Sequence, residues 1–181
     1  MGRYECDSPA ILIETMLKRF NEEYGKQDVI FLTGDLTAHS TAAPIDDPTW
    51  KDTYALLLSC FTGINELLVH YFPDTLILPA FGNNDSKYHD NPIPDSDRDF
   101  FYDYVYRLWF ELLPANAKHL LKLPEETKEA IRSDFMTGGY YRIDLQDDLS
   151  VLSLNSLYYD SERDPDIAHG SGSLMMEWLS T

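Results

Sequence analysis

The sequence lacks several features that would assign a chain to a class at once. Its 181 residues include only two cysteines, Cys6 and Cys60, too few for a disulfide framework or a zinc cluster. No apolar run approaches the roughly eighteen residues that span a bilayer, and we expect no signal peptide at the start. Basic residues are also few: 14 Lys and Arg stand against 31 Asp and Glu, a net charge of −17. Nucleic-acid binding needs basic stripes, so the sequence predicts no nucleic-acid partner.

The composition is that of a globular domain. Apolar residues make up 44% of the chain and aromatic residues 13%, too many for a disordered segment. This length suffices for one hydrophobic core, so we predict a single domain over residues 1–181. The acidic charge favours solubility, and it is compatible with phosphate ligands where bound cations reverse the local field.

Two short apolar runs, residues 28–33 and 75–81, are each followed by glycine and an oxygen-bearing side chain, in Gly34-Asp35 and Gly82-Asn83. Apolar runs of this length bounded by turn residues are typical of buried strands. A helical pattern at residues 54–71 separates them, so we predict parallel strands with a right-handed crossover. Asp35 and Asn83 should then lie at one sheet edge, where α/β proteins place their chemistry.

The other elements follow from apolar periodicity and from glycine and proline. We predict further helices at residues 9–24, 99–113, 115–123, 125–132 and 174–179. The alternating runs at residues 140–145 and 149–154 predict a hairpin. The fold class is therefore α/β. Residues 34–48 form a loop long enough to indicate a functional role.

Asp35 and Asn83 have side chains that suit a dinuclear metal site. A carboxylate can bridge two cations, and an amide carbonyl can bind one of them without adding charge. Two cations about 3.5–4 Å apart clamp a phosphoryl group and lower the pKa of a bridging water. The alternative is an Asp and an Asn that only stabilise turns, since both are common after strands.

The motifs Gly34-Asp35 and Gly82-Asn83-Asn84-Asp85 resemble those of the calcineurin-like metallophosphoesterase superfamily. The longer run from Gly34 to His39 is similar to the acid sphingomyelinase branch, which keeps a histidine four residues after the aspartate. Further similar segments cover most of the chain, at residues 4–9, 138–141, 152–155 and 177–179. The resemblance implies part of a metallophosphoesterase β-sandwich, with mixed sheets flanked by helices.

The resemblance also implies roles for individual residues. Asp35 corresponds to the ligand that bridges two divalent metal ions, with zinc expected and manganese or iron as alternatives. Asn83 corresponds to a ligand of the second metal, and His39 to a histidine that protonates the leaving group. Asn84 and Asp85 belong to the catalytic set by their place in the motif. A loop histidine without a catalytic role is the alternative for His39.

The sequence departs from the family pattern in three places. Asn84 stands where the family usually has a catalytic histidine, and an amide cannot deliver a proton. A Gly-Asn-Asn-Asp motif is, however, similar to that of endopolyphosphatases. The upstream Asp-x-His motif and the downstream histidines are not found, so the chain resembles an incomplete domain. We interpret His89 as a solvent-exposed loop histidine, with an approach to the site from this loop as the alternative, and His169 as a loop residue.

Three functions follow from this reading. The first is metal-dependent hydrolysis of a phosphoester, most simply a phosphodiester in a small molecule or lipid head group. The second is endopolyphosphatase-like cleavage of phosphoanhydrides, which Asn84 suggests. The third, from another class, is a truncated remnant that acts as a binding module without catalysis. For the parent enzyme, the resemblance implies a secretory, lysosomal or extracellular location.

Overall fold

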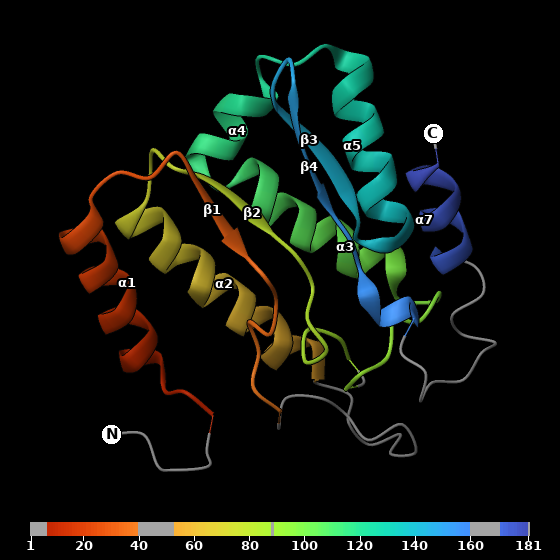
Figure 1. The fold of residues 1–181 in the computed structure, drawn as a ribbon. Helices are drawn as coiled ribbons and strands as arrows, with labels where there is room; N and C mark the ends of the chain where they lie inside the picture. The colour runs from red at the N-terminus through yellow and green to blue at the C-terminus, as the bar shows by residue number, and fades with distance from the viewer. Residues whose placement is uncertain (1–6, 40–52, 88, 160–170, 181) are drawn as a thin grey trace.

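The protein has a mixed α/β architecture in which helices surround two small sheets (Figure 1). A computed structural model describes residues 7–39, 53–87, 89–159 and 171–180. In chain order its regular elements are α1 (Ala10–Tyr24), β1 (Val29–Leu32), α2 (Thr53–Tyr71), β2 (Leu76–Pro79), α3 (Arg98–Tyr106), a π-helical turn (Arg107–Glu111), α4 (Pro114–Leu120), α5 (Glu125–Gly138), β3 (Tyr141–Gln146), β4 (Leu149–Ser153), a 3₁₀ turn (Ser156–Tyr159) and α7 (Ser171–Leu179). The predicted α/β class is confirmed.

Strands β1 and β2 form the parallel pair that the sequence predicts. Val29 is opposite Leu76 and Leu32 is opposite Pro79, so the two strands are in register over their full length. The Ala80 N–H donates to the Leu32 carbonyl at 2.7 Å, which carries the pairing one step beyond β2. Helix α2 connects the strands, and their carboxyl ends therefore lie side by side (Figure 1).

A buried asparagine, Asn116 at the start of α4, occupies the other edge of β2. Its Oδ1 accepts from the Ile77 N–H at 2.9 Å, and its Nδ2 donates to the Ile77 carbonyl. The same Nδ2 donates to the Trp109 carbonyl at 2.8 Å. A side chain thus satisfies the backbone groups that a neighbouring strand would otherwise pair with.

The main core is dominated by aromatic side chains from α2, α3, α5 and the segment after β2. Phe135 on α5 is completely buried and has ring contacts with residues of four other segments: the segment after β2, α3, the π-helical turn and β3. The largest members of this cluster are Phe61, Phe81, Phe101, Tyr102, Trp109, Phe110, Phe135 and Tyr141. The predicted helix at residues 99–113 supplies many of these aromatic side chains. It ends in a π-helical turn, where the Leu112 N–H donates to Arg107 O instead of the usual i−4 carbonyl.

The hairpin of β3 and β4 is antiparallel, with Tyr141 opposite Ser153, as the alternation predicts. It joins the end of β2 through side chains. The Tyr141 hydroxyl donates to the Pro79 carbonyl at 2.6 Å, and Ser153 Oγ donates to the same oxygen at 3.2 Å. Within the described residues the strands form two separate two-stranded sheets.

Several element boundaries differ from the sequence prediction. Helix α1 begins at Ala10 with Pro9 as its N-cap, so proline is not its first helical residue. Helix α5 continues six residues beyond the predicted end, to Gly138, because the left-handed stop is Gly139 with φ 70°. Pro114 begins α4 rather than only ending the preceding helix. Residues 40–48 of the predicted long loop, Tyr4 to Cys6 and His169 lie outside the described residues.

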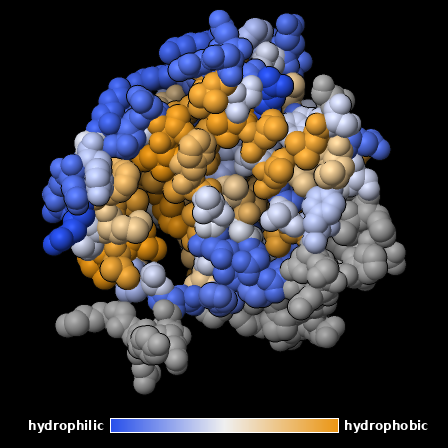
Figure 2. Space-filling view, viewed as in Figure 1, coloured by the Kyte–Doolittle hydropathy of each residue, from blue (hydrophilic) through white to orange (hydrophobic). Residues whose placement is uncertain are grey.

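Apolar side chains remain exposed on α1 and β1. Phe31 in β1 and Met16 in α1 are both 58% exposed. Figure 2 shows apolar residues across this face, with hydrophilic residues gathered below them over the loops that follow the strands. Helix α1 packs on the α2 end mainly through Leu17 and Phe20. No described helix combines the length and hydropathy required to cross a membrane.

Candidate active site

The site is built where the chain leaves β1 and β2. After β1, Gly34 has φ 96° and Asp35 has φ 54°, so the chain turns through the left-handed region at both residues. A Cβ on Gly34 would lie 2.2 Å from the Gly82 nitrogen, and one on Gly82 would lie 2.2 Å from the Asp35 nitrogen. Only glycine permits this approach of two backbones. The prediction that Asp35 and Asn83 share one sheet edge is confirmed.

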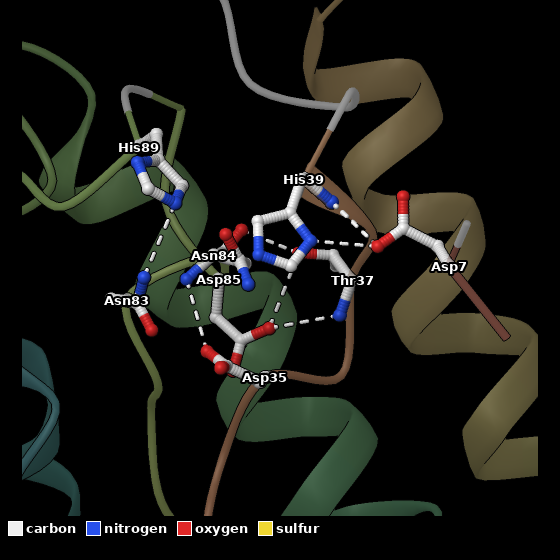
Figure 3. Close-up of polar contacts among 8 residues, drawn as sticks. All are labelled: Asp7, Asp35, Thr37, His39, Asn83, Asn84, Asp85 and His89. Carbon is white, nitrogen blue, oxygen red and sulfur yellow. Dashed lines mark hydrogen bonds and ion pairs between the residues drawn. The ribbon is translucent and has the colours of Figure 1, made fainter. Parts of the chain in front are cut away.

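Asp35 lines a cleft of about 370 Å³. Its Oδ1 accepts from the Asn84 N–H at 3.1 Å, which fixes the carboxyl group across the two loops (Figure 3). The cleft is lined by Thr33, Gly34, Asp35, Phe81, Gly82, Asn83, Ser156 and Leu157. The 3₁₀ turn after the hairpin thus supplies one wall, and the strand ends supply the other.

Asn83 lines this cleft, and its side-chain amino group is engaged by the loop that follows. Its Nδ2 donates to Asp90 Oδ1 at 2.7 Å and lies 3.2 Å from His89 Nε2. Figure 3 shows the Asn83 oxygen on the side away from His89. A backbone hydrogen bond holds the same two residues together, since the Asp90 N–H donates to the backbone carbonyl of Asn83 at 2.8 Å.

His89 approaches the site from the loop after β2, which was the alternative to a loop histidine without a role. Its Nε2 lies 3.2 Å from Asn83 Nδ2 and its Nδ1 lies 2.8 Å from Asp90 Oδ2, while 38% of the side chain remains exposed. Its centroid is 5.8 Å from that of His39. Asp90 has a left-handed backbone conformation, with φ 60°, which bends the chain back toward Asn83. Sequence spacing gave no sign of that bend.

Asp85 is buried beneath the site, with only 1% of its surface exposed. Its Oδ2 accepts from the Gly82 N–H at 2.9 Å, and its Oδ1 accepts from the Thr37 N–H at 3.1 Å. The Thr37 hydroxyl also donates to the Asn84 carbonyl. The Asp85 pKa is raised to about 6, mainly by burial and in smaller part by the nearby Asp35 carboxylate, while the backbone hydrogen bonds act to lower it. Asp85 therefore connects the two loops through a buried carboxyl group.

Asn84 is also buried, with 2% of its surface exposed. Its backbone N–H holds Asp35, and its backbone carbonyl accepts from Thr37. Its side-chain Oδ1 has no hydrogen-bond partner within the described part of the chain. Asn84 thus shapes the site through its backbone, while its amide oxygen remains available for a further donor.

His39 lies at the outer edge of the site and is largely exposed. Its Nδ1 is 2.7 Å from Asp7 Oδ1, and its backbone N–H donates to the same oxygen at 3.4 Å (Figure 3). The hydrogen bond to the Asp7 carboxylate raises the pKa of His39 and lowers that of Asp7. Sequence reasoning missed Asp7 as a site residue. The available signal was its place in the segment Cys6-Asp7-Ser8-Pro9, one of those that resemble the sphingomyelinase branch.

The donors at this edge fit part of a metal site. Asp35 offers a carboxylate and Asn83 an amide oxygen, which are ligands for hard or borderline divalent cations. Among the residues that the structure describes, no three His, Cys, Asp or Glu side chains cluster closely enough to hold a metal. A stable site therefore needs ligands in addition to Asp35 and Asn83.

The model of the calcineurin-like phosphoesterase family matches residues 8–181, nearly the entire chain. The chain belongs to this family. The match includes the Gly34-Asp35 and Gly82-Asn83 motifs that form the cleft.

The chain is similar to curated relatives of two kinds. Sphingomyelinase phosphodiesterase C of Dictyostelium discoideum is 26% identical over 162 residues, 90% of this chain and 31% of that protein. Acid sphingomyelinase-like phosphodiesterase 3b of Mus musculus is 31% identical over 77% of this chain and 30% of that protein. The endopolyphosphatase of Schizosaccharomyces pombe is 27% identical over 97% of this chain and 29% of that protein. The chain spans less than a third of the length of each of these relatives.

Proposed function

We propose that the protein hydrolyses a phosphodiester, with divalent cations held in part by Asp35 and Asn83. The observation that carries the proposal is the meeting of these two side chains at one cleft, through the backbone contact of Gly34 and Gly82. Membership of the calcineurin-like phosphoesterase family supports the reaction class. The β-sandwich with mixed sheets that the family resemblance implies is part of the same proposal.

The ligand set is proposed from the chemistry of the two side chains. Asp35 supplies a carboxylate whose position is fixed by the Asn84 N–H. Asn83 supplies a neutral oxygen, because its amino group is bound to Asp90. Zinc is expected, with manganese or iron as alternatives, and at least one further protein ligand is required. When bound, two such cations would lower the pKa of a water molecule and neutralise the phosphoryl oxygens.

His39 is proposed as the general acid. Hydrolysis forms one phosphorus–oxygen bond from water and breaks the bond to the leaving alcohol, whose oxygen must then gain a proton. An imidazolium can supply that proton near neutral pH, and a raised pKa keeps more of His39 protonated there. The water loses its proton to solvent, so the overall reaction yields a phosphomonoester and an alcohol.

The proposed substrate is a phosphodiester in a small molecule or a lipid head group. Similarity to proteins named sphingomyelin phosphodiesterases supports this choice over an unspecified phosphoester. A secretory, lysosomal or extracellular location accompanies this proposal.

Polyphosphate is a second candidate substrate. The chain is similar to an endopolyphosphatase over 97% of its length, and Asn84 replaces the expected histidine in the Gly82–Asp85 motif. The net charge of −17 opposes it, because a polyanionic chain needs a basic surface. A phosphodiester is therefore the first choice.

Metal-dependent turnover tests the proposal. The chain is supplied with manganese or zinc and assayed with a chromogenic phosphodiester and with polyphosphate. We expect hydrolysis of the diester that falls at least about 10²-fold in Asp35→Ala, because the fixed carboxylate is lost. Asp147→Asn, in the exposed turn of the hairpin, is the matched control and should retain activity. Absence of both metal uptake and turnover would instead support the non-catalytic binding module.

A further inference from the structure

A second carboxylate–imidazole pair, Asp7 and His39, lies at the outer edge of the site and does not belong to the proposed metal-ligand set. Asp7 lies just before α1, and His39 lies beyond the Gly34-Asp35 turn, 32 residues along the chain. Asp7 Oδ1 is 2.7 Å from His39 Nδ1 and also accepts from the His39 backbone N–H at 3.4 Å. One carboxyl oxygen thus contacts both the ring and the main chain of the same histidine.

We propose that Asp7 is a positioning residue for His39, holding Nδ1 protonated so that Nε2 is the nitrogen that exchanges a proton with the substrate. An ionised carboxylate is an acceptor only, so the ring nitrogen that faces it must carry the hydrogen. The opposite nitrogen is then the one that gains and loses a proton. The inference rests on the proposed function for the use of His39 as an acid.

The second ring nitrogen of His39, Nε2, lies on the side of the ring opposite Asp7. Figure 3 shows the second ring nitrogen of His39 on the side away from Asp7, where Asn84 and His89 are drawn. The His39 and His89 rings are 5.8 Å apart between centroids and tilted by 37°. Because His89 contacts Asn83, the free edge of His39 faces the loop that supplies the second proposed metal ligand.

The charged groups around His39 come from three segments. Asp7 precedes α1, Asp35 follows β1, and Asp90 follows β2 together with His89. The hydrogen bond to Asp7 has the largest effect in raising the His39 pKa, and the more distant Asp35 and Asp90 carboxylates add to it. Removing Asp7 should therefore change both the protonation and the tautomer of this ring, whereas a distant surface carboxylate should change neither.

Nitrogen-15 NMR of the histidine rings in the metal-free chain tests the proposal. His39→Gln identifies the His39 signals among those of the five histidines. In the unmodified chain we expect neutral His39 to carry its proton on Nδ1. Asp7→Asn keeps an acceptor oxygen but removes the charge, so the Nδ1–H tautomer should persist while the pKa falls. Asp7→Ala removes both, so the tautomer preference should also be lost.

Two further variants complete the test. Glu23→Gln makes the same charge change on the exposed face of α1 and should leave His39 unchanged. Asp7→Glu restores a carboxylate and should recover part of the raised pKa. Unchanged tautomer and pKa in Asp7→Asn and Asp7→Ala would overturn the inference. Because no metal or substrate is added, that result would leave the proposed hydrolysis untouched, and loss of hydrolysis would leave the NMR result untouched.

Discussion

Gly34 and Gly82 meet backbone to backbone at the carboxyl ends of β1 and β2. A methyl group on Gly34 would lie 2.2 Å from the Gly82 nitrogen and 2.5 Å from its Cα. A side chain at either glycine would therefore push the two turns apart. This contact explains how residues 48 positions apart, Asp35 and Asn83, come to share one cleft.

Gly34→Ala should destabilise the fold and separate the two turns. The new Cβ would overlap backbone atoms, and φ 96° is a strained conformation for alanine. We expect a loss of at least about 2 kcal/mol in the free energy of unfolding. Urea denaturation followed by circular dichroism measures it.

Gly63→Ala is the matched control. Gly63 lies inside α2, and a Cβ there would meet no atom within 4 Å. Alanine is the better helix former, so this variant should gain about 0.5–1 kcal/mol. Equal effects of the two substitutions would contradict the backbone contact.

Asp85 should make stability depend on pH. Burial raises its folded-state pKa to about 6, above the ordinary value of 3.8. The protonated form is therefore favoured by folding, and this contribution is complete below the ordinary pKa and is lost as pH rises through about 6. Relative to Asp85→Asn, the unmodified chain should gain up to about 3 kcal/mol between about pH 7.5 and about pH 3.5.

The comparison with Asp85→Asn isolates this group, since the other carboxylates are present in both chains. The measurement is urea denaturation of both proteins at a series of pH values. A difference in unfolding free energy that stays constant across this range would show that Asp85 titrates normally, and would contradict its burial between the two loops.

Much of the fold was predictable because it follows from local patterns. The apolar runs before Gly34 and Gly82, with a helix between them, specified the parallel pair and its shared edge. The hairpin around residues 147–148 followed from alternation. The contacts of Asn116 with Ile77 and Trp109 were not predictable, because a polar residue inside a helix gives no sign of the strand edge it will satisfy.

The candidate site was predictable only in part, because some of its residues are brought together by tertiary contacts that leave no local pattern in the sequence. Motifs identified Asp35, Asn83 and His39, whose spacing from glycine carries information. Asp7 and His89 depend on tertiary contacts, through the packing of α1 and the left-handed bend at Asp90. Asp85 belongs to the motif, yet sequence alone did not show that its carboxyl group is directed into the protein.

Asn116→Ala should be among the most destabilising substitutions outside the site. It would leave the Ile77 N–H and carbonyl and the Trp109 carbonyl without their partner in a buried region. The expected loss is about 2–4 kcal/mol, since each unsatisfied buried group costs about 1–3 kcal/mol. Thermal denaturation measures it. Asn21→Ala, on the surface helix α1, is the control and should change stability by less than about 0.5 kcal/mol.

His39→Gln should lower hydrolysis without removing metal binding. Glutamine keeps a polar side chain but cannot donate a proton as an acid, and general acid catalysis contributes about 10²–10⁴-fold. The loss should be largest for substrates with poor leaving groups, which depend most on protonation. Equal losses for good and poor leaving groups would contradict an acid role.

The central claim is that Asp35 and Asn83 hold a cation at the paired ends of β1 and β2. Manganese is paramagnetic and broadens the backbone amide signals of nearby residues in a nitrogen-15 NMR spectrum. On titration with manganese, we predict that the signals of Gly34, Asp35, Gly82 and Asn83 broaden first, and that Asp35→Asn abolishes this selectivity while Asp147→Asn preserves it. Broadening that is spread over surface carboxylates and unchanged in Asp35→Asn would contradict the claim.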